Sequence, residues 1–290
     1  MSTENQLSKE LKSFQDVWQG GYYEGNPLDS LGPSSFGEFG YISTLYAVYV
    51  YCIRPYVTSS TAVLEIGPGR GAWTKTMLHA REIWCLDAKS REDNEIDFYL
   101  GCPKNLNYFQ VKDFACCELP DDKFDYFFSF GALCHVSWTG IEQYIHNLYP
   151  KLRHGAHGFI MVADYDKANQ LMIDPWRYNV IDRVHSAKRM WLLRALDHFI
   201  GKSVGKRSLF LDSLAENYKN RLARFLGIRL LGKTKVRFKD KQEDDVPRPG
   251  RWYHAGIERT VALLERVGFE VIERDVDLVP RDPVIHFRKV

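Results

Sequence analysis

From residue 62 to residue 166, short apolar runs alternate with stretches whose apolar residues recur every three or four positions. The apolar runs are rich in β-branched and aromatic residues and predict strands at about 62–66, 82–87, 106–111, 124–130 and 158–164. The spacing between the runs predicts helices at about 72–80, 89–98 and 140–152. Alternation of strand and helix is typical of a parallel sheet covered by helices on both faces, so we predict an α/β fold.

The same pattern resumes near the C-terminus, from Arg251, where a helix with Ile257, Val261, Leu264 and Val267 inward precedes strands at about 269–276 and 284–290. Before the sheet, the apolar spacing predicts a helix at about 4–18 and another at about 41–56. The loop between these two helices is unusually rich in glycine and aromatic residues.

The strand–helix rhythm is interrupted between about residues 167 and 250, where two amphipathic helices are predicted. We therefore divide the chain into four parts. They are an N-terminal helical and aromatic lid segment (1–61), a core (62–166), a basic helical insertion (167–250) and a C-terminal completion of the core sheet (251–290).

A glycine-rich turn follows the first predicted strand of the core, in the run Glu65-Ile66-Gly67-Pro68-Gly69-Arg70-Gly71. Glycine lets the backbone press against a ligand, because it has no Cβ and tolerates positive φ. The spacing departs from the G-x-G-x-x-G pattern that receives a pyrophosphate. A leading acid with alternating glycines suits a ligand that has a cationic amine and no phosphate.

Three further elements follow in order: Asp87, Asp113-Phe114 and the segment Phe124 to His135. Asp87 ends the second strand, 20 residues past Gly67, where a carboxylate can accept bonds from both ribose hydroxyls. With the glycine turn, these elements resemble the core of the class I S-adenosylmethionine-dependent methyltransferases, whose last strand is antiparallel. We therefore predict a Rossmann-like, mostly parallel seven-stranded sheet.

The resemblance implies that the turn glycines, with Glu65 and Asp87, hold S-adenosyl-L-methionine. Asp113 would accept from the adenine amino group, Phe114 would pack on the base, and Phe130 would face the methyl donor. Simpler alternatives are a loop carboxylate for Asp87, a turn cap for Asp113 and a core side chain for Phe114.

The run from Ser129 to Ser137 lacks the Asn/Asp-Pro-Pro-aromatic motif common in methylases that act on the nitrogens of bases. It is similar instead to small-molecule methyltransferases, which often carry a histidine here. We predict His135 as the general base for a hydroxyl, because a neutral imidazole accepts a proton near neutral pH. The alternative is a histidine that caps the following helix. Asp164, after the fifth strand, is predicted to orient the acceptor or assist the base, or else simply to end the strand.

Weaker acceptor-site candidates are His254 and three tyrosines of the N-terminal segment: Tyr22, Tyr23 and Tyr41. We predict no catalytic metal, because the acidic pair Asp121-Asp122 precedes the fourth strand at its N-terminal end.

The net charge of +2 hides a polarised distribution. Residues 183–239 contain fifteen Lys/Arg against three acids, an excess of twelve positive charges that leaves −10 for the rest of the chain. We favour an O-methyltransferase acting on a small polyhydroxylated acceptor, anionic and held in part by this insertion. Alternatives are a nucleic-acid methyltransferase, a membrane-associated enzyme acting on a lipid-linked glycan, a protein that binds the cofactor without catalysis, and a solvated basic face.

The six cysteines include no C-x-x-C, which is typical of reduced thiols in the cytosol. The N-terminus has no secretory signal pattern, and the longest apolar stretch, about 41–57, is too short and polar to span a bilayer. We expect a cytoplasmic protein, and the sequence leaves its oligomeric state open.

Overall fold

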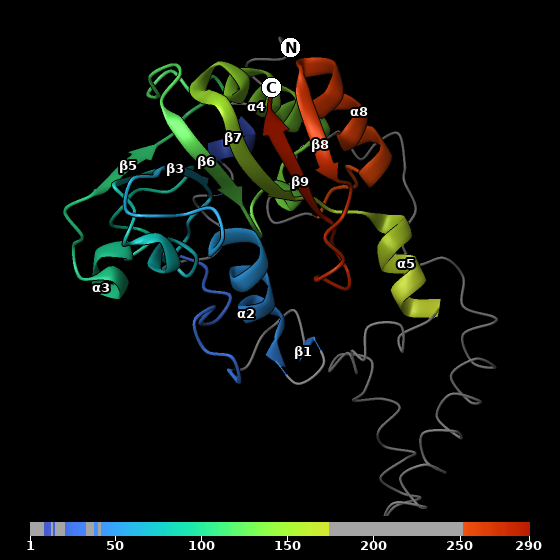
Figure 1. The fold of residues 1–290 in the computed structure, drawn as a ribbon, viewed down its shortest axis with the longest axis horizontal. Helices are drawn as coiled ribbons and strands as arrows, with labels where there is room; N and C mark the ends of the chain where they lie inside the picture. The colour runs from blue at the N-terminus through green and yellow to red at the C-terminus, as the bar shows by residue number, and fades with distance from the viewer. Residues whose placement is uncertain (1–8, 13, 15–20, 33–37, 40–41, 174–251) are drawn as a thin grey trace, which may run out of the picture. The chain divides into compact units, whose positions relative to one another are not determined.

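The computed structural model describes residues 9–12, 14, 21–32, 38–39, 42–173 and 252–290 (Figure 1). The main sheet consists of β3 (Ala62–Ile66), β4 (Glu82–Asp87), β5 (Leu106–Gln110), β6 (Phe124–Ser129), β7 (Leu152–Met161), β8 (Phe269–Glu273) and β9 (Val284–Lys289). The helices are α2 (Thr44–Val48), α3 (Ile96–Leu100), α4 (Trp138–Leu148), α5 (Tyr165–Ile173) and α8 (Ile257–Val267). Shorter elements are the hairpin strands β1 (Glu38–Phe39) and β2 (Ile42–Ser43), a π-helical turn (Tyr49–Ile53) and 3-10 turns at Thr74–Met77, Leu133–His135 and Tyr149–Lys151.

The strands of the main sheet follow the order β5-β4-β3-β6-β7-β9-β8 (Figure 1). Neighbours from β5 to β7 are parallel, and β9 is antiparallel to both β7 and β8. The first five positions have the doubly wound order, which reverses between β3 and β6. The predicted fold class is confirmed: the sheet is Rossmann-like, seven-stranded and mostly parallel, with an antiparallel last strand.

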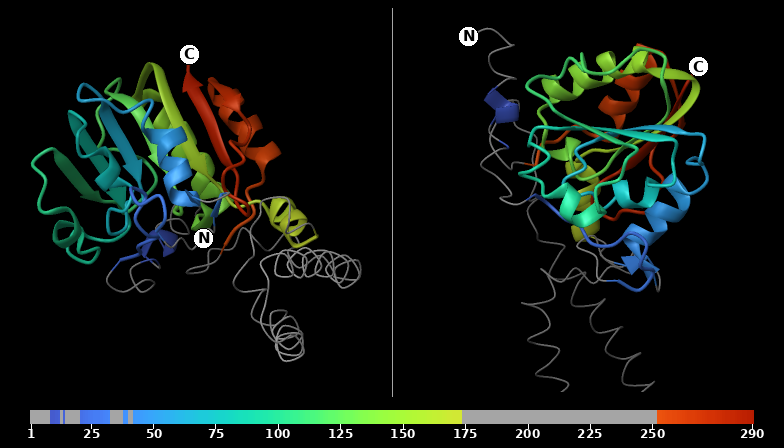
Figure 2. Two further views of the ribbon diagram at one scale, coloured as in Figure 1. Left: turned by 60° about the horizontal axis from the view of Figure 1, so that its bottom comes forward. Right: turned by 90° about the vertical axis from the view of Figure 1, so that its left-hand side faces the viewer.

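Helices cover both faces of the sheet, and α2 lies on the opposite side from α4 and α8 (Figure 2). One core lies beneath α4 and α8, with Ile141 and Leu264 among its fully buried side chains. The other lies beneath α2 and the π-helical turn and includes Leu45 and Ile53. All five residues of β3 are buried, as expected for a central parallel strand.

Two predicted core helices are wrong in extent. The stretch 72–80 holds only the 3-10 turn Thr74–Met77, where the Thr76 hydroxyl donates to the Trp73 carbonyl and competes with helical bonding. The stretch 89–98 forms turns until α3 begins at Ile96, because Glu95 has a left-handed backbone with φ 51°. Two other elements also differ. The predicted helix 41–56 divides into α2 and the π-helical turn, and β7 begins at Leu152 rather than near 158.

The sheet belongs to a compact unit formed by Met1–Ala168 and Lys239–Val290. Of the second unit, Asn169–Phe238, the structure describes only the end of α5. The two predicted insertion helices and Tyr41 lie outside the described residues, as does most of the predicted helix 4–18. Within the described part, no helix is long and apolar enough to cross a membrane.

Candidate cofactor and active site

The glycine turn lies directly after β3, beside the point where the strand order reverses. Ligands of open α/β sheets bind at this point, outside the carboxyl ends of the strands. Gly67, Gly69 and Gly71 have φ of 73°, 52° and 86°, which L side chains rarely adopt. The local chain therefore requires glycine at each of the three predicted positions.

Other parts of the chain approach this turn closely. A Cβ on Gly67 would lie 2.2 Å from the Cβ of Ala132, and one on Gly69 would lie 2.6 Å from the carbonyl oxygen of Tyr22. That carbonyl accepts a hydrogen bond of 3.0 Å from the Arg70 backbone N–H. Residues 21–24 thus cross the glycine turn, which brings the N-terminal segment to the carboxyl end of the sheet.

Glu65 is only 2% exposed and lies in β3 just before the turn. Its Oε2 accepts hydrogen bonds from the Thr74 hydroxyl at 2.7 Å and from the Cys85 thiol at 3.6 Å. Burial raises the pKa of Glu65 to about 7, partly offset by these bonds and raised further by Asp87. The 3-10 turn after the glycines therefore serves to hold this carboxyl in place.

Asp87 lies at the tip of β4, and its carboxylate accepts backbone N–H bonds from Gly69 at 3.3 Å and Lys89 at 2.8 Å. Burial raises its pKa, while the two backbone bonds oppose that shift. The structure thus places Asp87, the residue predicted to bind the ribose, in direct contact with the glycine turn.

Glu24, which the sequence does not single out, also lies at this end of the sheet. It is 8% exposed, and its Oε1 is 3.0 Å from where a Cβ on Gly131 would lie, just past the end of β6. Burial raises the pKa of Glu24 to about 8, and the neighbouring Glu65 raises it further. The one available signal was an acid in the aromatic, glycine-rich loop, which does not by itself indicate where the loop folds.

Phe130 and His135 flank the end of β6. Phe130 is 2% exposed, and its ring packs against Trp73 with 4.6 Å between centroids, so its side chain belongs to the core. His135 is partly exposed in the 3-10 turn Leu133–His135, and its backbone N–H donates to the Ala132 carbonyl. His135 therefore follows the same strand end that Glu24 covers.

Asp113 and Phe114 differ in their surroundings. Asp113 is exposed, and its Oδ1 accepts from the Ala115 N–H at 2.9 Å, a turn-capping bond. Phe114 is fully buried and packs edge-on against Tyr144 beneath α4. The geometry favours the simpler alternatives for both residues, a turn cap and a core side chain.

Asp164 uses both carboxylate oxygens to hold helix N-termini. Oδ1 accepts from the Lys167 N–H in α5, and Oδ2 accepts from the Ile257 N–H at the start of α8, each at 2.8 Å. Such bonds are those of a helix N-cap. They favour a positioning role for Asp164 over the predicted role at the acceptor.

The chain from Trp252 to Gly256 is attached to the same edge of the sheet. Tyr253 donates its backbone N–H to the Cys134 carbonyl at 2.9 Å. His254 Nδ1 accepts from the Tyr165 N–H at 3.0 Å, and the two rings stack with centroids 4.8 Å apart. His254 therefore contributes to this connection through its ring.

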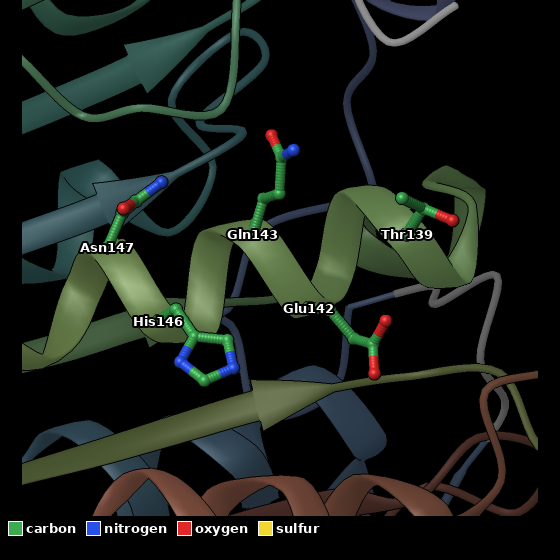
Figure 3. A pocket seen from close by; sticks show the side chains of 5 residues that line it. All are labelled: Thr139, Glu142, Gln143, His146 and Asn147. Carbon is green, nitrogen blue, oxygen red and sulfur yellow. The ribbon is translucent and has the colours of Figure 1, made fainter. Parts of the chain in front are cut away.

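A depression of about 430 Å³ lies away from the strand ends, along α4 (Figure 3). Its lining side chains all come from that one helix: Thr139, Glu142, Gln143, His146 and Asn147. It contains none of the predicted site residues. Among the described residues, no group of three or more His, Cys, Asp and Glu side chains is placed to hold a metal ion.

No protein-family model matches this chain, and no curated protein matches it in sequence. Among solved structures, it is similar to an S-adenosylmethionine-dependent methyltransferase from Mesorhizobium loti. That match has 14% identity, a TM-score of 0.49, and covers 85% of this chain and 100% of the other.

Two further similar structures have lower identity. One is a methyltransferase of the same cofactor class from Aquifex aeolicus, with 11% identity, a TM-score of 0.47 and 98% of each chain covered. The other is the N-methyltransferase NodS from Bradyrhizobium japonicum WM9, with 11% identity, a TM-score of 0.45, and 85% of this chain and 96% of that one covered. At such identities the likeness concerns the fold, and the strand order itself defines that fold here.

Proposed function

We propose that this protein is an S-adenosylmethionine-dependent methyltransferase that methylates a hydroxyl of a small polyhydroxylated acceptor. The observation that carries the proposal is a set of three carboxyls around the glycine turn: Glu24 and Glu65 are buried, and Asp87 is half-buried. They lie at the strand-order reversal, where this fold binds ligands. A cationic ligand offsets the cost of burying such groups in their charged form.

The residues present fit this cofactor. Glycine at 67, 69 and 71 keeps the turn free of side chains, and Asp87 at the tip of β4 has the position of a ribose ligand. Glu65 supports the turn from beneath through its bond to Thr74. When bound, S-adenosylmethionine supplies a methyl group on a positively charged sulfur. Carboxyls at this edge of the sheet suit that ligand, because a nearby cation favours their charged form.

The proposed role of His135 is to take the proton from the acceptor hydroxyl as the oxygen gains its methyl group. A base of this kind typically contributes 10² to 10⁴ in rate. His135 supports this role by its place, partly exposed just after the end of β6. The acceptor is proposed to be a sugar or a glycosylated or phosphorylated metabolite. The excess of basic residues between 183 and 239 would attract its anionic groups.

Titration calorimetry with S-adenosylmethionine and S-adenosylhomocysteine tests the proposed cofactor. We expect both to bind the unaltered protein with a stoichiometry of one. Failure of both to bind would overturn the proposed function.

The variant His135→Ala tests the proposed base. We expect turnover to fall by about 10² or more, because the variant loses the proposed acceptor of the hydroxyl proton. The dissociation constant of S-adenosylmethionine should stay within about twofold of the unaltered protein. His146→Ala, at an exposed position on α4, is a matched control that should leave both quantities unchanged. Full turnover in His135→Ala would reject the base assignment and leave the cofactor assignment standing.

A further inference from the structure

Glu24 combines features that are costly in a folded protein. Its carboxyl is buried, and within the described part of the chain its Oε2 has no hydrogen-bond partner. A buried oxygen without a partner loses its hydrogen bonds to water, and no hydrogen bond within the protein replaces them. Glu24 therefore differs from Glu65 and Asp87, whose carboxyls accept bonds from Thr74 and from backbone N–H groups.

The chain also makes room for this carboxyl. Gly131 has φ 73°, and a Cβ there would lie 3.0 Å from Glu24 Oε1. Glycine at this position thus serves two purposes, since it permits the left-handed turn after β6 and lets the carboxyl approach the backbone. The carboxyl is consequently held against the end of β6, beside the strand-order reversal.

Three acids lie along the carboxyl edge in the order of the strands beneath them. Asp87 is at the tip of β4, Glu65 near the tip of β3, and Glu24 over the turn after β6. Electrostatic coupling follows the same spatial order, since Asp87 raises the pKa of Glu65 and Glu65 raises the pKa of Glu24. No lysine or arginine of the described chain is among the groups that shift the pKa of Glu24 or Glu65.

This order matches the order of groups along the proposed ligand. If the ribose lies at Asp87, the rest of the molecule extends along the edge toward β3 and β6. Its sulfonium and α-ammonium groups then approach the acids at that end. Of these acids, Glu24 is the one with a buried carboxyl oxygen that accepts no hydrogen bond within the described part of the chain.

We propose that Glu24 binds the α-ammonium group of the methionine part of S-adenosylmethionine, so that residues 21–24 form part of the cofactor site. This inference rests on the proposed function. It assigns the N-terminal segment a specific contact with the amino-acid end of the cofactor, and that contact is absent for ligands that end at the thioether.

The test is the binding of three probes to Glu24→Gln, measured by calorimetry on the full chain. S-adenosylmethionine and S-adenosylhomocysteine both carry the α-ammonium, whereas 5′-methylthioadenosine lacks the amino-acid part altogether. We expect the variant to bind the first two at least about tenfold more weakly, because a charge-assisted bond is lost. Binding of methylthioadenosine should stay within about twofold of the unaltered protein.

Two further variants control for folding and for charge. Glutamine has the shape of the protonated glutamic acid, and the raised pKa of Glu24 means that the fold already accommodates this neutral form. Glu265→Gln, at an exposed position on α8, removes the same charge and should change no affinity. Glu24→Asp keeps the charge on a shorter side chain and should give an intermediate loss if Glu24→Gln proves unstable.

The outcomes separate the two hypotheses. If Glu24→Gln binds all three probes as tightly as the unaltered protein, or loses affinity equally for all three, the assignment to Glu24 is overturned while the cofactor stands. If the unaltered protein binds none of the three, the proposed function is itself overturned and this inference with it. A loss confined to the two ammonium-bearing probes supports the inference.

Discussion

Gly69 and Gly101 share a left-handed backbone, with φ of 52° and 75°, but they differ in their surroundings. A Cβ on Gly69 would lie 2.6 Å from the Tyr22 carbonyl oxygen, whereas a Cβ on Gly101 would meet nothing within 4 Å. Comparing alanine at the two positions therefore separates backbone strain from close packing at the glycine turn.

We expect Gly101→Ala to lower the free energy of unfolding by about 1–2 kcal/mol, the cost of a left-handed backbone for an L residue. Gly69→Ala should cost about 1–3 kcal/mol more, because the Tyr22 carbonyl is backbone and moves only with the segment that carries it. Urea unfolding of both variants measures the difference. Equal losses would show that residues 21–24 do not press on the glycine turn as the structure has them.

At the scale of elements, β7 and β9 place two histidines side by side. Nδ1 of His157 lies 2.9 Å from Nε2 of His286, and Nδ1 of His286 lies 3.3 Å from a carboxylate oxygen of Glu273 in β8. The Tyr56 ring packs on both histidines, with centroid distances of 4.7 and 5.4 Å. The two histidines therefore join the antiparallel end of the sheet to the helical layer beside it.

Other charged and titratable groups face the pair from each side. Glu270 of β8 and Arg288 of β9 act on His157, and the Tyr51 hydroxyl donates to Glu273 at 2.8 Å. Burial lowers the pKa of both histidines from 6.5, although Glu273 opposes the shift at His286. The neutral pair is thus the form that the fold favours.

This pKa shift predicts a pH dependence of stability. The unfolded chain, whose histidines have the ordinary pKa, binds protons more readily than the folded one. Stability is therefore fully present above about pH 6.5 and is lost as the pH falls below it. Melting temperatures between pH 8 and pH 5 should show this loss. The loss should be smaller in His157→Gln and unchanged in His146→Gln, which alters an exposed histidine of α4. Identical pH slopes in all three proteins would contradict the prediction.

The strands were predictable because buried parallel strands are continuous apolar runs, as in β3, where all five residues are buried. The helices were less predictable. At 72–80 the apolar spacing predicts a helix, but only a 3-10 turn forms, in which Thr74 bonds to the distant Glu65 and Thr76 bonds to the Trp73 carbonyl. At 89–98 the left-handed Glu95 delayed the helix. Local conformation of this kind is set by tertiary contacts that periodicity does not record.

The same division holds for the candidate site. The glycine turn and Asp87 could be located because they follow strand ends, and parallel strands bring their ends together. Glu24 could not be located, because its position depends on how a loop without periodicity crosses the sheet. Phe114 shows the opposite error. The sequence predicts that it contacts the base, but its side chain is fully buried in the core.

At the scale of the whole molecule, the two kinds of charge are separated along the chain. Residues 183–239 carry an excess of twelve positive charges, which leaves −10 for the rest. Three of the acids lie at the carboxyl edge of the sheet, where Glu24 and Glu65 are buried and Asp87 is half-buried. A cationic cofactor and an anionic acceptor would each find complementary charge in a different part of the sequence.

The double variant Arg189→Glu/Arg194→Glu tests whether the insertion binds the acceptor. These residues lie outside the described part of the chain, so the expectation comes from charge alone. For a sugar phosphate that supports methyl transfer, we expect the Michaelis constant to rise about tenfold or more, because an attraction becomes a repulsion. For the matching sugar without phosphate, the constant should stay within about twofold. Steady-state rates for the two acceptors measure the difference.

The double variant Lys75→Glu/Lys104→Glu is the matched control, since it changes the net charge equally at two exposed positions of the described core. Similar constants for both double variants would attribute the effect to overall charge rather than to the insertion.

Vesicles containing phosphatidylserine and phosphatidylcholine test the membrane alternative by flotation at physiological salt. An enzyme with a soluble acceptor should stay in the unbound fraction. Binding to lipid headgroups requires a membrane-binding surface, and an enzyme does not need such a surface to bind a soluble acceptor. Flotation that Arg189→Glu/Arg194→Glu abolishes would instead assign the basic residues to an anionic membrane.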